Sequence, residues 1–161
     1  MTEYGKQLRE KQILKRVYCL REKQFKKYYT DLSKKGGTFG NLLVGQLESR
    51  MDSVVYRAGF AKSRLGARQL VTHGFFLVNG KPVNIPSYIL KPGSEVSFKE
   101  SKVKKYSCQT VREELKGKKG DFPSWLEVNI EDLKIKLINS PREQEANLEA
   151  KTQGVVEFYS R

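Results

Sequence analysis

The sequence is poor in the residues that build metal and disulfide sites. Its 161 residues include one histidine and two cysteines, Cys19 and Cys108. Two cysteines are too few for a disulfide framework, and a single histidine leaves no His or Cys pair with metal-ligand spacing. The composition argues against a zinc finger and against a secreted disulfide scaffold. We therefore expect no bound metal and no cofactor.

Long apolar runs are also missing. Only 38% of the residues are hydrophobic, and no segment approaches the roughly 20 apolar residues that span a bilayer. The N-terminal stretch MTEYGKQLREKQ is charged and lacks the apolar run of a signal peptide. These features predict a modest core in a cytosolic or organelle-interior protein with free thiols.

Acidic residues are scarce, and they are unevenly spread. The chain has 31 Lys and Arg against 18 Asp and Glu, for a net charge of +13. Residues 1–120 hold 26 basic and 10 acidic side chains, whereas residues 121–161 hold 5 and 8. Such an excess of positive charge favours a polyanion as partner, either nucleic acid or an anionic membrane. The acidic last quarter is the part expected to avoid a nucleic acid.

Helical patterns dominate the first half of the chain. Residues 3–18 and 21–33 combine strong helix formers with apolar positions on one side, and the glycine-rich stretch KKGGTFGN predicts a break after them. A third helix, ended by Gly59, is predicted from apolar residues at helical spacing: Leu43, Leu47, Met51, Val54 and Val55. Ser63 is placed to cap a fourth helix that runs to His73, with Gly74 as its left-handed stop.

Two arginines of that fourth helix are spaced for anion binding. Arg64 and Arg68 lie four residues apart and share one face beside the apolar stripe. A guanidinium group can hold two phosphate oxygens at once, so this pattern suits phosphate contact. From these residues alone, a pair of ordinary surface arginines is about equally consistent. His73, at the helix end, is expected to cap the helix or to contact RNA.

Strand patterns dominate the second half. The apolar run 75–78 is followed by Asn79-Gly80, the strongest two-residue hairpin signal, and residues 95–98 alternate as a half-buried strand. A short helix is predicted at 110–116, weaker strands at 128–138 and a polar loop at 140–153. Trp125 and Leu126 are expected to be buried, and the closing VVEFYSR to dock on the protein. No GxxxxGK or GxGxxG motif and no catalytic arrangement of side chains is present, so an enzyme is disfavoured.

The run LESRMDSVVYRAGFAKSRLGARQLVTHGFFLVNGKPVNIPSY, residues 47–88, resembles the RNA-binding domain of the ribosomal protein S4 family. YGKQLREKQ near the N-terminus and EFYSR at the end resemble the same family. The resemblance implies an α+β fold with a helical first domain, residues 1–46 and 150–161. It also implies an inserted RNA-binding domain, residues 47–149 with a core at 47–98, in which two helices pack on a mostly antiparallel sheet.

The same resemblance implies a structural constituent of the small ribosomal subunit. Members bind a multi-helix junction in the 5′ domain of small-subunit rRNA, nucleate assembly and support translational accuracy. The implied partners are this rRNA and neighbouring proteins, especially ribosomal protein S5, in a bacterial cytoplasmic ribosome or an organelle ribosome. Many members carry a further N-terminal segment, in some with metal-binding cysteines, which precedes YGKQLREKQ and has no counterpart here, so metal binding is not carried over.

The expected RNA contacts are basic and polar residues of the predicted helices and hairpin. They are Lys6, Arg9, Lys11, Lys15, Arg16, Lys26, Lys27, Arg50, Arg57, Lys62, Arg64, Arg68, Gln69, His73, Asn79 and Lys81.

Two other functions share the RNA-binding module. One is an RNA-modifying enzyme, because pseudouridine synthases and some tRNA synthetases contain a similar domain, but this chain has no room for their large catalytic domain. The other is a free RNA-binding factor that acts in ribosome rescue. Such factors lack YGKQLREKQ and EFYSR, so both flanking matches count against this alternative.

Overall fold

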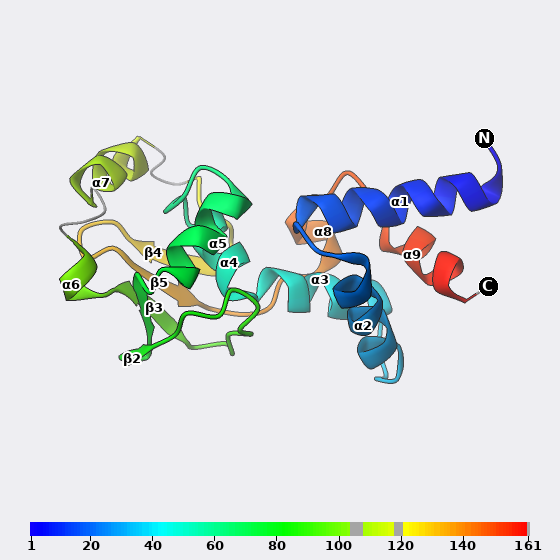
Figure 1. Cartoon of the computed structure of the whole chain (residues 1–161), viewed down its shortest axis with the longest axis horizontal. Coiled ribbons are helices and arrows are strands. Elements are labelled where there is room, and N and C mark those ends of the chain that lie inside the picture. Colours follow the sequence, from blue (N-terminus) through cyan, green and yellow to red (C-terminus); the bar gives the residue numbers. More distant parts are fainter. Residues whose placement is uncertain (104–107, 118–120, 161) are drawn as a thin grey trace. The chain divides into compact units, whose positions relative to one another are not determined.

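The structure, a computed structural model, describes residues 1–103, 108–117 and 121–160 (Figure 1). The chain forms two compact units. The first consists of Met1–Leu47 and Pro141–Arg161, and the second of Glu48–Ser140. The first is helical and the second contains an antiparallel sheet, so the predicted α+β class is confirmed.

The first unit is built from helices at both ends of the chain. They are α1 (Glu3–Val17), α2 (Glu22–Ser33), nearly all of α3 (Phe39–Glu48), α8 (Glu143–Ala146) and α9 (Thr152–Tyr159). The helices predicted at 3–18 and 21–33 are confirmed as α1 and α2. Thr2 caps α1, because its side-chain oxygen accepts a hydrogen bond of 3.0 Å from the Gly5 amide. The core of this unit includes Leu14, Phe25, Leu43, Leu47 and Val155.

Helix α9 packs along α1, so the end of the chain returns to the unit in which it began (Figure 1). The approach is close at Gly154, where a Cβ atom would lie 2.8 Å from the Glu10 Cβ. Val155 is fully buried in this contact. The docked C-terminus that the apolar VVEFYSR run predicts is therefore present, apart from residue 161, which lies outside the described residues.

The loop predicted at 140–153 is wrong, because α8 and the start of α9 lie there. The Glu143 carboxylate accepts a hydrogen bond of 3.0 Å from the Thr152 amide, and the Glu143 amide donates one of 3.0 Å to Asn41 Oδ1. Contacts to a residue about a hundred positions away hold this polar stretch, and no local pattern could show them. They place residues 141–149 with the helical unit, although the sequence-based boundary at 150 leaves them out.

The second unit combines helices with a five-stranded sheet. Helices α4 (Met51–Arg57) and α5 (Arg64–Thr72) precede the first strand, and α6 (Glu100–Val103) and α7 (Cys108–Lys116) follow the third. The strand order is β2-β1-β3-β5-β4, and all neighbours are antiparallel. The strands are β1 (Phe76–Val78), β2 (Lys81–Pro82), β3 (Glu95–Phe98), β4 (Leu126–Asn129) and β5 (Lys134–Leu137).

The hairpin between β1 and β2 follows from Asn79-Gly80. Both residues have positive φ, 50° and 83°, as the tightest hairpin turns require. The Asn79 side chain adds a further bond, because its Oδ1 accepts from the Glu95 amide at 2.9 Å. The asparagine thus fixes the turn to the neighbouring strand β3.

The single helix predicted from Leu43 to Gly59 is wrong, because the chain breaks between α3 and α4. The Met51 amide donates to the Tyr88 carbonyl and the Leu90 amide to the Ser49 carbonyl, both at 2.8 Å. These bonds to a distant segment replace the bonds of a continuous helix at this point. The apolar stripe nevertheless continues. Its Leu43 and Leu47 enter the first core, and its Met51, Val54 and Val55 enter the second.

Helix α5 begins and ends as predicted. The Ser63 hydroxyl accepts a hydrogen bond of 2.9 Å from the Gly66 amide, and Gly74 has a φ of 76° just beyond the helix. Ala67 and Val71 face the core and are fully buried. Trp125 and Leu126 are also buried, as expected.

Candidate nucleic-acid interface

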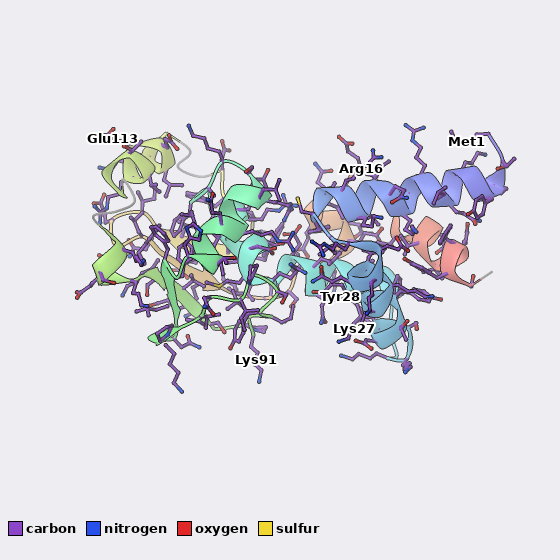
Figure 2. All side chains as sticks on the ribbon, viewed as in Figure 1. Met1, Arg16, Lys27, Tyr28, Lys91 and Glu113 are labelled. Carbon is purple, nitrogen blue, oxygen red and sulfur yellow. The ribbon has the colours of Figure 1, made fainter. Side chains whose placement is uncertain are left out.

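One group of the predicted RNA-binding residues lies on the surface, where charged or polar atoms can reach phosphate. In the first unit these are Lys6, Arg9, Arg16, Lys26 and Lys27, and in the second Lys62, Gln69, His73, Asn79 and Lys81. Figure 2 labels Arg16 on α1 and Lys27 on α2. It also labels Lys91, an exposed lysine in the segment before β3 that the prediction omitted.

Helix α5 presents a polar side to solvent. Because Ala67 and Val71 fill its buried side, Gln69 and His73 emerge on the opposite side. Lys62 lies just before the helix, 88% exposed, and its ammonium is only 3.8 Å from a Glu114 carboxylate oxygen. Such an exposed ion pair holds the lysine weakly and leaves it available to an RNA.

Lys11 is buried, contrary to the expectation that it lies on the RNA-facing surface. Its ammonium lies 2.8 Å from Glu22 Oε1 and 4.3 Å from the centre of the Phe158 ring. The side chain is only 6% exposed. A buried ammonium needs such partners, because its desolvation is costly without them. Lys11 therefore joins α1 to α2 and α9 inside the first unit.

Glu22 is the acceptor at the centre of this contact. It takes hydrogen bonds from Lys11, from Lys15 at 3.3 Å and from the Tyr159 hydroxyl at 2.9 Å. Burial acts to raise the pKa of Glu22, but the bonds from Lys11, Tyr159 and Lys15 and the charge of Lys11 outweigh it, so the pKa lies below its ordinary value. Lys15 is thus also bound to a carboxylate of its own unit, although its side chain remains partly exposed.

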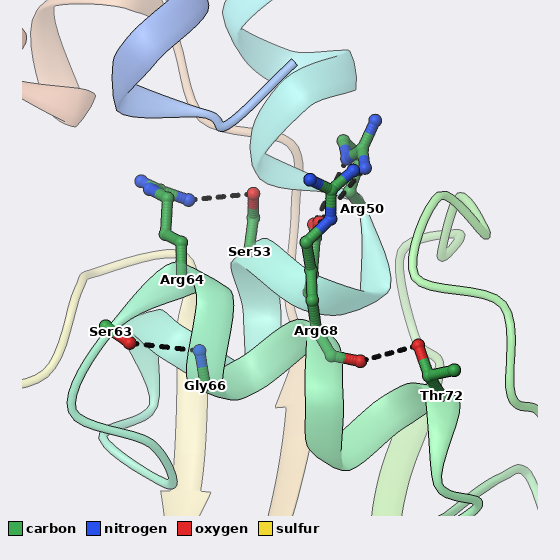
Figure 3. Close-up of polar contacts among 8 residues, drawn as sticks. Arg50, Ser53, Ser63, Arg64, Gly66, Arg68 and Thr72 are labelled. Carbon is green, nitrogen blue, oxygen red and sulfur yellow. Dashed lines mark hydrogen bonds and ion pairs between the residues drawn. The ribbon is translucent and has the colours of Figure 1, made fainter. Parts of the chain in front are cut away.

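The second unit contains a group of four arginines and two carboxylates, which we call the arginine cluster: Glu48, Arg50, Asp52, Arg57, Arg64 and Arg68. Three of the arginines hydrogen-bond the carboxylates or Ser53, and Figure 3 shows Arg50, Arg64 and Arg68 in place. Four positive and two negative charges leave the cluster with a net charge of +2.

Glu48 holds two of the arginines and is itself fully buried. Its carboxylate accepts two hydrogen bonds from Arg57, Nε to Oε2 at 3.1 Å and Nη2 to Oε1 at 2.7 Å. Arg64 Nη2 lies 3.6 Å from the same Oε1. Arg64 also donates to Ser53 Oγ at 2.9 Å and lies 4.7 Å from the Tyr56 ring centre. The paired hydrogen bonds between Arg57 and Glu48 fix both the distance and the orientation of the Arg57 guanidinium group.

Asp52 holds the other two. Arg50 donates to it twice, Nε to Oδ1 at 3.1 Å and Nη2 to Oδ2 at 3.0 Å. Arg68 Nε lies 3.3 Å from Asp52 Oδ2. The side chain of Arg50 is fully buried, and that of Arg64 is 9% exposed. The expectation that these two arginines lie on the surface is therefore wrong, since the carboxylates draw them inward.

Sequence reasoning missed Glu48, Asp52 and Ser53 as parts of this arrangement. A usable signal was present, because Glu48 and Asp52 directly follow Leu47 and Met51, two positions of the predicted apolar stripe. Carboxylates that border such a stripe become partly or fully buried, and buried carboxylates need cationic partners. The four nearby arginines supply them.

A metal-ligand cluster and a membrane-spanning helix are both absent from the described parts of the chain. Across residues 1–103, 108–117 and 121–160, no three His, Cys, Asp or Glu side chains come together as metal ligands. Of the helices in these ranges, none has the length and apolar character needed to cross a membrane.

Comparison with known proteins points to one family. Residues 1–48 match the ribosomal protein S4/S9 N-terminal domain, and residues 49–96 match the S4 domain. Small ribosomal subunit protein uS4 of Thermodesulfovibrio yellowstonii is 44% identical over 100% of this chain and 76% of its own length. The uS4 proteins of Thermus thermophilus and Dictyoglomus turgidum are 43% and 45% identical, over 99% and 100% of this chain and 76% of their own lengths.

The chain belongs to the uS4 family of ribosomal proteins. Members of the uS4 family are structural proteins and not enzymes, which agrees with the expectation from the sequence. The match of residues 1–48 lies outside the shared RNA-binding module. It therefore favours a uS4 protein over the two alternatives, which share only the RNA-binding module with this chain.

Proposed function

We propose that this uS4-family chain is a structural constituent of the small ribosomal subunit that binds small-subunit rRNA directly. Its binding site is a multi-helix junction in the 5′ domain, where it nucleates assembly and supports translational accuracy. The observation that carries this proposal is the presence of exposed basic side chains on both units of a chain whose first 120 residues hold 26 basic and 10 acidic groups. Groups spread over two units can contact several RNA helices at once.

The two units take different parts in this binding. Unit Glu48–Ser140 is the RNA-binding domain, which uses Lys62, Gln69, His73, Asn79 and Lys81 around α5 and the β1–β2 hairpin. The helical unit adds Lys26, Lys27 and the exposed residues of α1. Arg57 and Arg68 contribute as partly exposed members of the arginine cluster. Lys11, Arg50 and Arg64 support the fold beneath this surface.

The acidic last quarter of the chain faces protein. Residues 121–161 hold 8 acidic and 5 basic side chains, and acidic groups near phosphate are repelled. This segment is therefore suited to a neighbouring ribosomal protein, and the family resemblance makes ribosomal protein S5 the first candidate. The proposed location is the ribosome of a bacterium or of an organelle.

Chemical footprinting on small-subunit rRNA tests this function. Addition of the protein should protect the backbone around one junction in the 5′ domain and leave a large-subunit rRNA of similar length unprotected. The variant Lys26→Ala/Lys27→Ala should weaken this protection. Its matched control is Lys134→Ala/Lys136→Ala, which removes two exposed lysines from strand β5 in the acidic quarter. Equal protection of both RNAs, or equal loss in both variants, would contradict specific binding.

A further inference from the structure

Two buried carboxylates lie within the most arginine-rich part of the proposed RNA-binding domain. The side chains of Glu48 and Asp52 are 0% and 4% exposed, and each forms ion pairs with two arginines of the cluster. By charge alone, an acidic residue at this place would oppose the binding of phosphate. The arginines around these two carboxylates change this expectation.

Each carboxylate pairs one nearly inaccessible arginine with one that reaches the surface. Glu48 contacts Arg64 and Arg57, whose side chains are 9% and 23% exposed. Asp52 contacts Arg50 and Arg68, whose side chains are 0% and 28% exposed. The more buried arginine, Arg64 or Arg50, offsets the negative charge of the carboxylate. The more exposed arginine, Arg57 or Arg68, keeps part of its side chain in contact with solvent.

We propose that Glu48 and Asp52 are positioning residues, which hold the guanidinium groups of Arg57 and Arg68 ready for phosphate contact. The proposal rests on the proposed function, because it concerns the same RNA-binding surface. An arginine side chain that is already ordered loses less rotamer freedom when RNA binds, so more of its interaction with phosphate appears as affinity. The net charge of +2 keeps the cluster attractive to an anion although two carboxylates lie within it.

The charge balance distinguishes this arrangement from a simple structural ion pair. The buried arginines Arg50 and Arg64 offset the buried carboxylates of Asp52 and Glu48, as a network that serves folding requires. The net charge of +2 therefore belongs to the partly exposed Arg57 and Arg68, where a phosphate can reach it. Arg57 also lies 5.7 Å from the Trp125 ring centre, and Arg64 lies over Tyr56, so aromatic faces help to orient the arginines.

The decisive variant is Asp52→Asn, which removes a negative charge with almost no change of shape. Its matched control is Glu127→Gln, which removes an exposed carboxylate from strand β4 of the same unit. If Asp52 positions Arg68, Asp52→Asn should weaken binding to the small-subunit rRNA about tenfold, although the protein becomes more positive. Glu127→Gln should bind as tightly as the unaltered protein or slightly more tightly.

A double-mutant cycle separates positioning from an effect on folding. Arg68→Ala should weaken binding and lower the slope of log affinity against log salt by about 1, because one phosphate contact is lost. Asp52→Asn should lower the slope by the same amount, and the double variant should bind like Arg68→Ala alone. Additive losses would mean that Asp52 acts independently of Arg68 and would overturn the proposal.

Asp52→Asn leaves the buried Arg50 without its carboxylate and can therefore prevent folding. A third variant tests the proposal even in that case. Arg68→Lys keeps the positive charge at a partly exposed position but loses the planar guanidinium group. It should bind as weakly as Arg68→Ala. Binding equal to that of the unaltered protein would overturn the proposal. If the unaltered protein itself fails to bind this rRNA, the proposed function is wrong, and that result is distinct from either outcome above.

Discussion

The Tyr159 hydroxyl donates a hydrogen bond of 2.9 Å to Glu22 Oε1, which joins the last helix to the second across 137 positions of the chain. The ring of Tyr159 also stacks on Tyr29, with 4.8 Å between ring centres. Burial, together with the bond and charge of Glu22, raises the pKa of Tyr159 above its ordinary value of 10.0. This contact connects α9 to α2 within the helical unit, and the first two predictions test it.

Glu22→Gln should make the protein less sensitive to acid. The folded chain holds the Glu22 pKa below its ordinary value of 4.5, so the charged carboxylate adds stability above about pH 4.5, and this stability is lost as pH falls through the lower, folded pKa. Because the side chain is 46% exposed, we expect a loss of only about 1 kcal/mol at pH 7. Urea unfolding at pH 7 and pH 3 measures the free energy of unfolding of the variant and of the unaltered protein. The difference between the two proteins should be smaller at pH 3. A difference that stays constant would contradict a stabilising role of the charged Glu22.

Deletion of residues 155–161 should destabilise the free protein. It removes the buried Val155 and both aromatic rings that face Lys11, and the loss of such packing amounts to about 3 kcal/mol or more. Calorimetry would show a lower melting temperature, and hydrogen exchange would show faster exchange in α1. If melting is unchanged while incorporation into subunits fails, the tail serves as an interface with another molecule instead.

Arg64→Ala and Lys62→Ala should separate stability from binding. Arg64 is buried against Glu48, Ser53 and Tyr56, so its removal takes one of two cationic partners from the buried Glu48, breaks the bond to Ser53 and should lower the free energy of unfolding by about 2–4 kcal/mol. Lys62 is exposed, so its removal should change stability by less than about 0.5 kcal/mol while weakening rRNA binding. Thermal melts and filter binding on both variants provide the test. Equal melting temperatures would show that the burial of Arg64 contributes little to folding.

Binding to small-subunit rRNA should depend strongly on salt. If about 6–10 phosphates are neutralised, affinity should fall roughly 10³–10⁵-fold between 50 and 200 mM salt, by the relation established for duplex DNA. Titration over this range at constant pH measures the slope. An affinity that hardly changes with salt would contradict an interaction carried by the basic residues of the first 120 positions.

Recognition should depend on the shape of the RNA more than on its base sequence. The narrow major groove of A-form RNA hides the base edges, so long basic side chains mostly reach phosphates and 2′-hydroxyls. Exchange of base pairs within the junction stems, with geometry preserved, should leave affinity within a few-fold. Loss of binding in most exchanged RNAs would show direct reading of bases.

Local patterns sufficed for much of the fold. Helix α5 is delimited by the Ser63 cap and by Gly74, and Asn79-Gly80 specifies the hairpin, because the backbone geometry of each depends on residues only a few positions apart. The family resemblance followed from motifs in the same way. The positive charge of the first 120 residues likewise needs no structure to point to a polyanion.

The tertiary structure alone decided which charged residues remain at the surface. Lys11, Arg50 and Arg64 resemble the exposed lysines and arginines in sequence, yet each is buried and has a carboxylate within 4 Å that compensates its charge. The break at Arg50 and the helix at Glu143–Ala146 likewise depend on partners from distant segments, Tyr88 and Asn41. Helical spacing shows which side chains share a face of one element, but the identity of the groups opposite that face depends on how the whole chain folds.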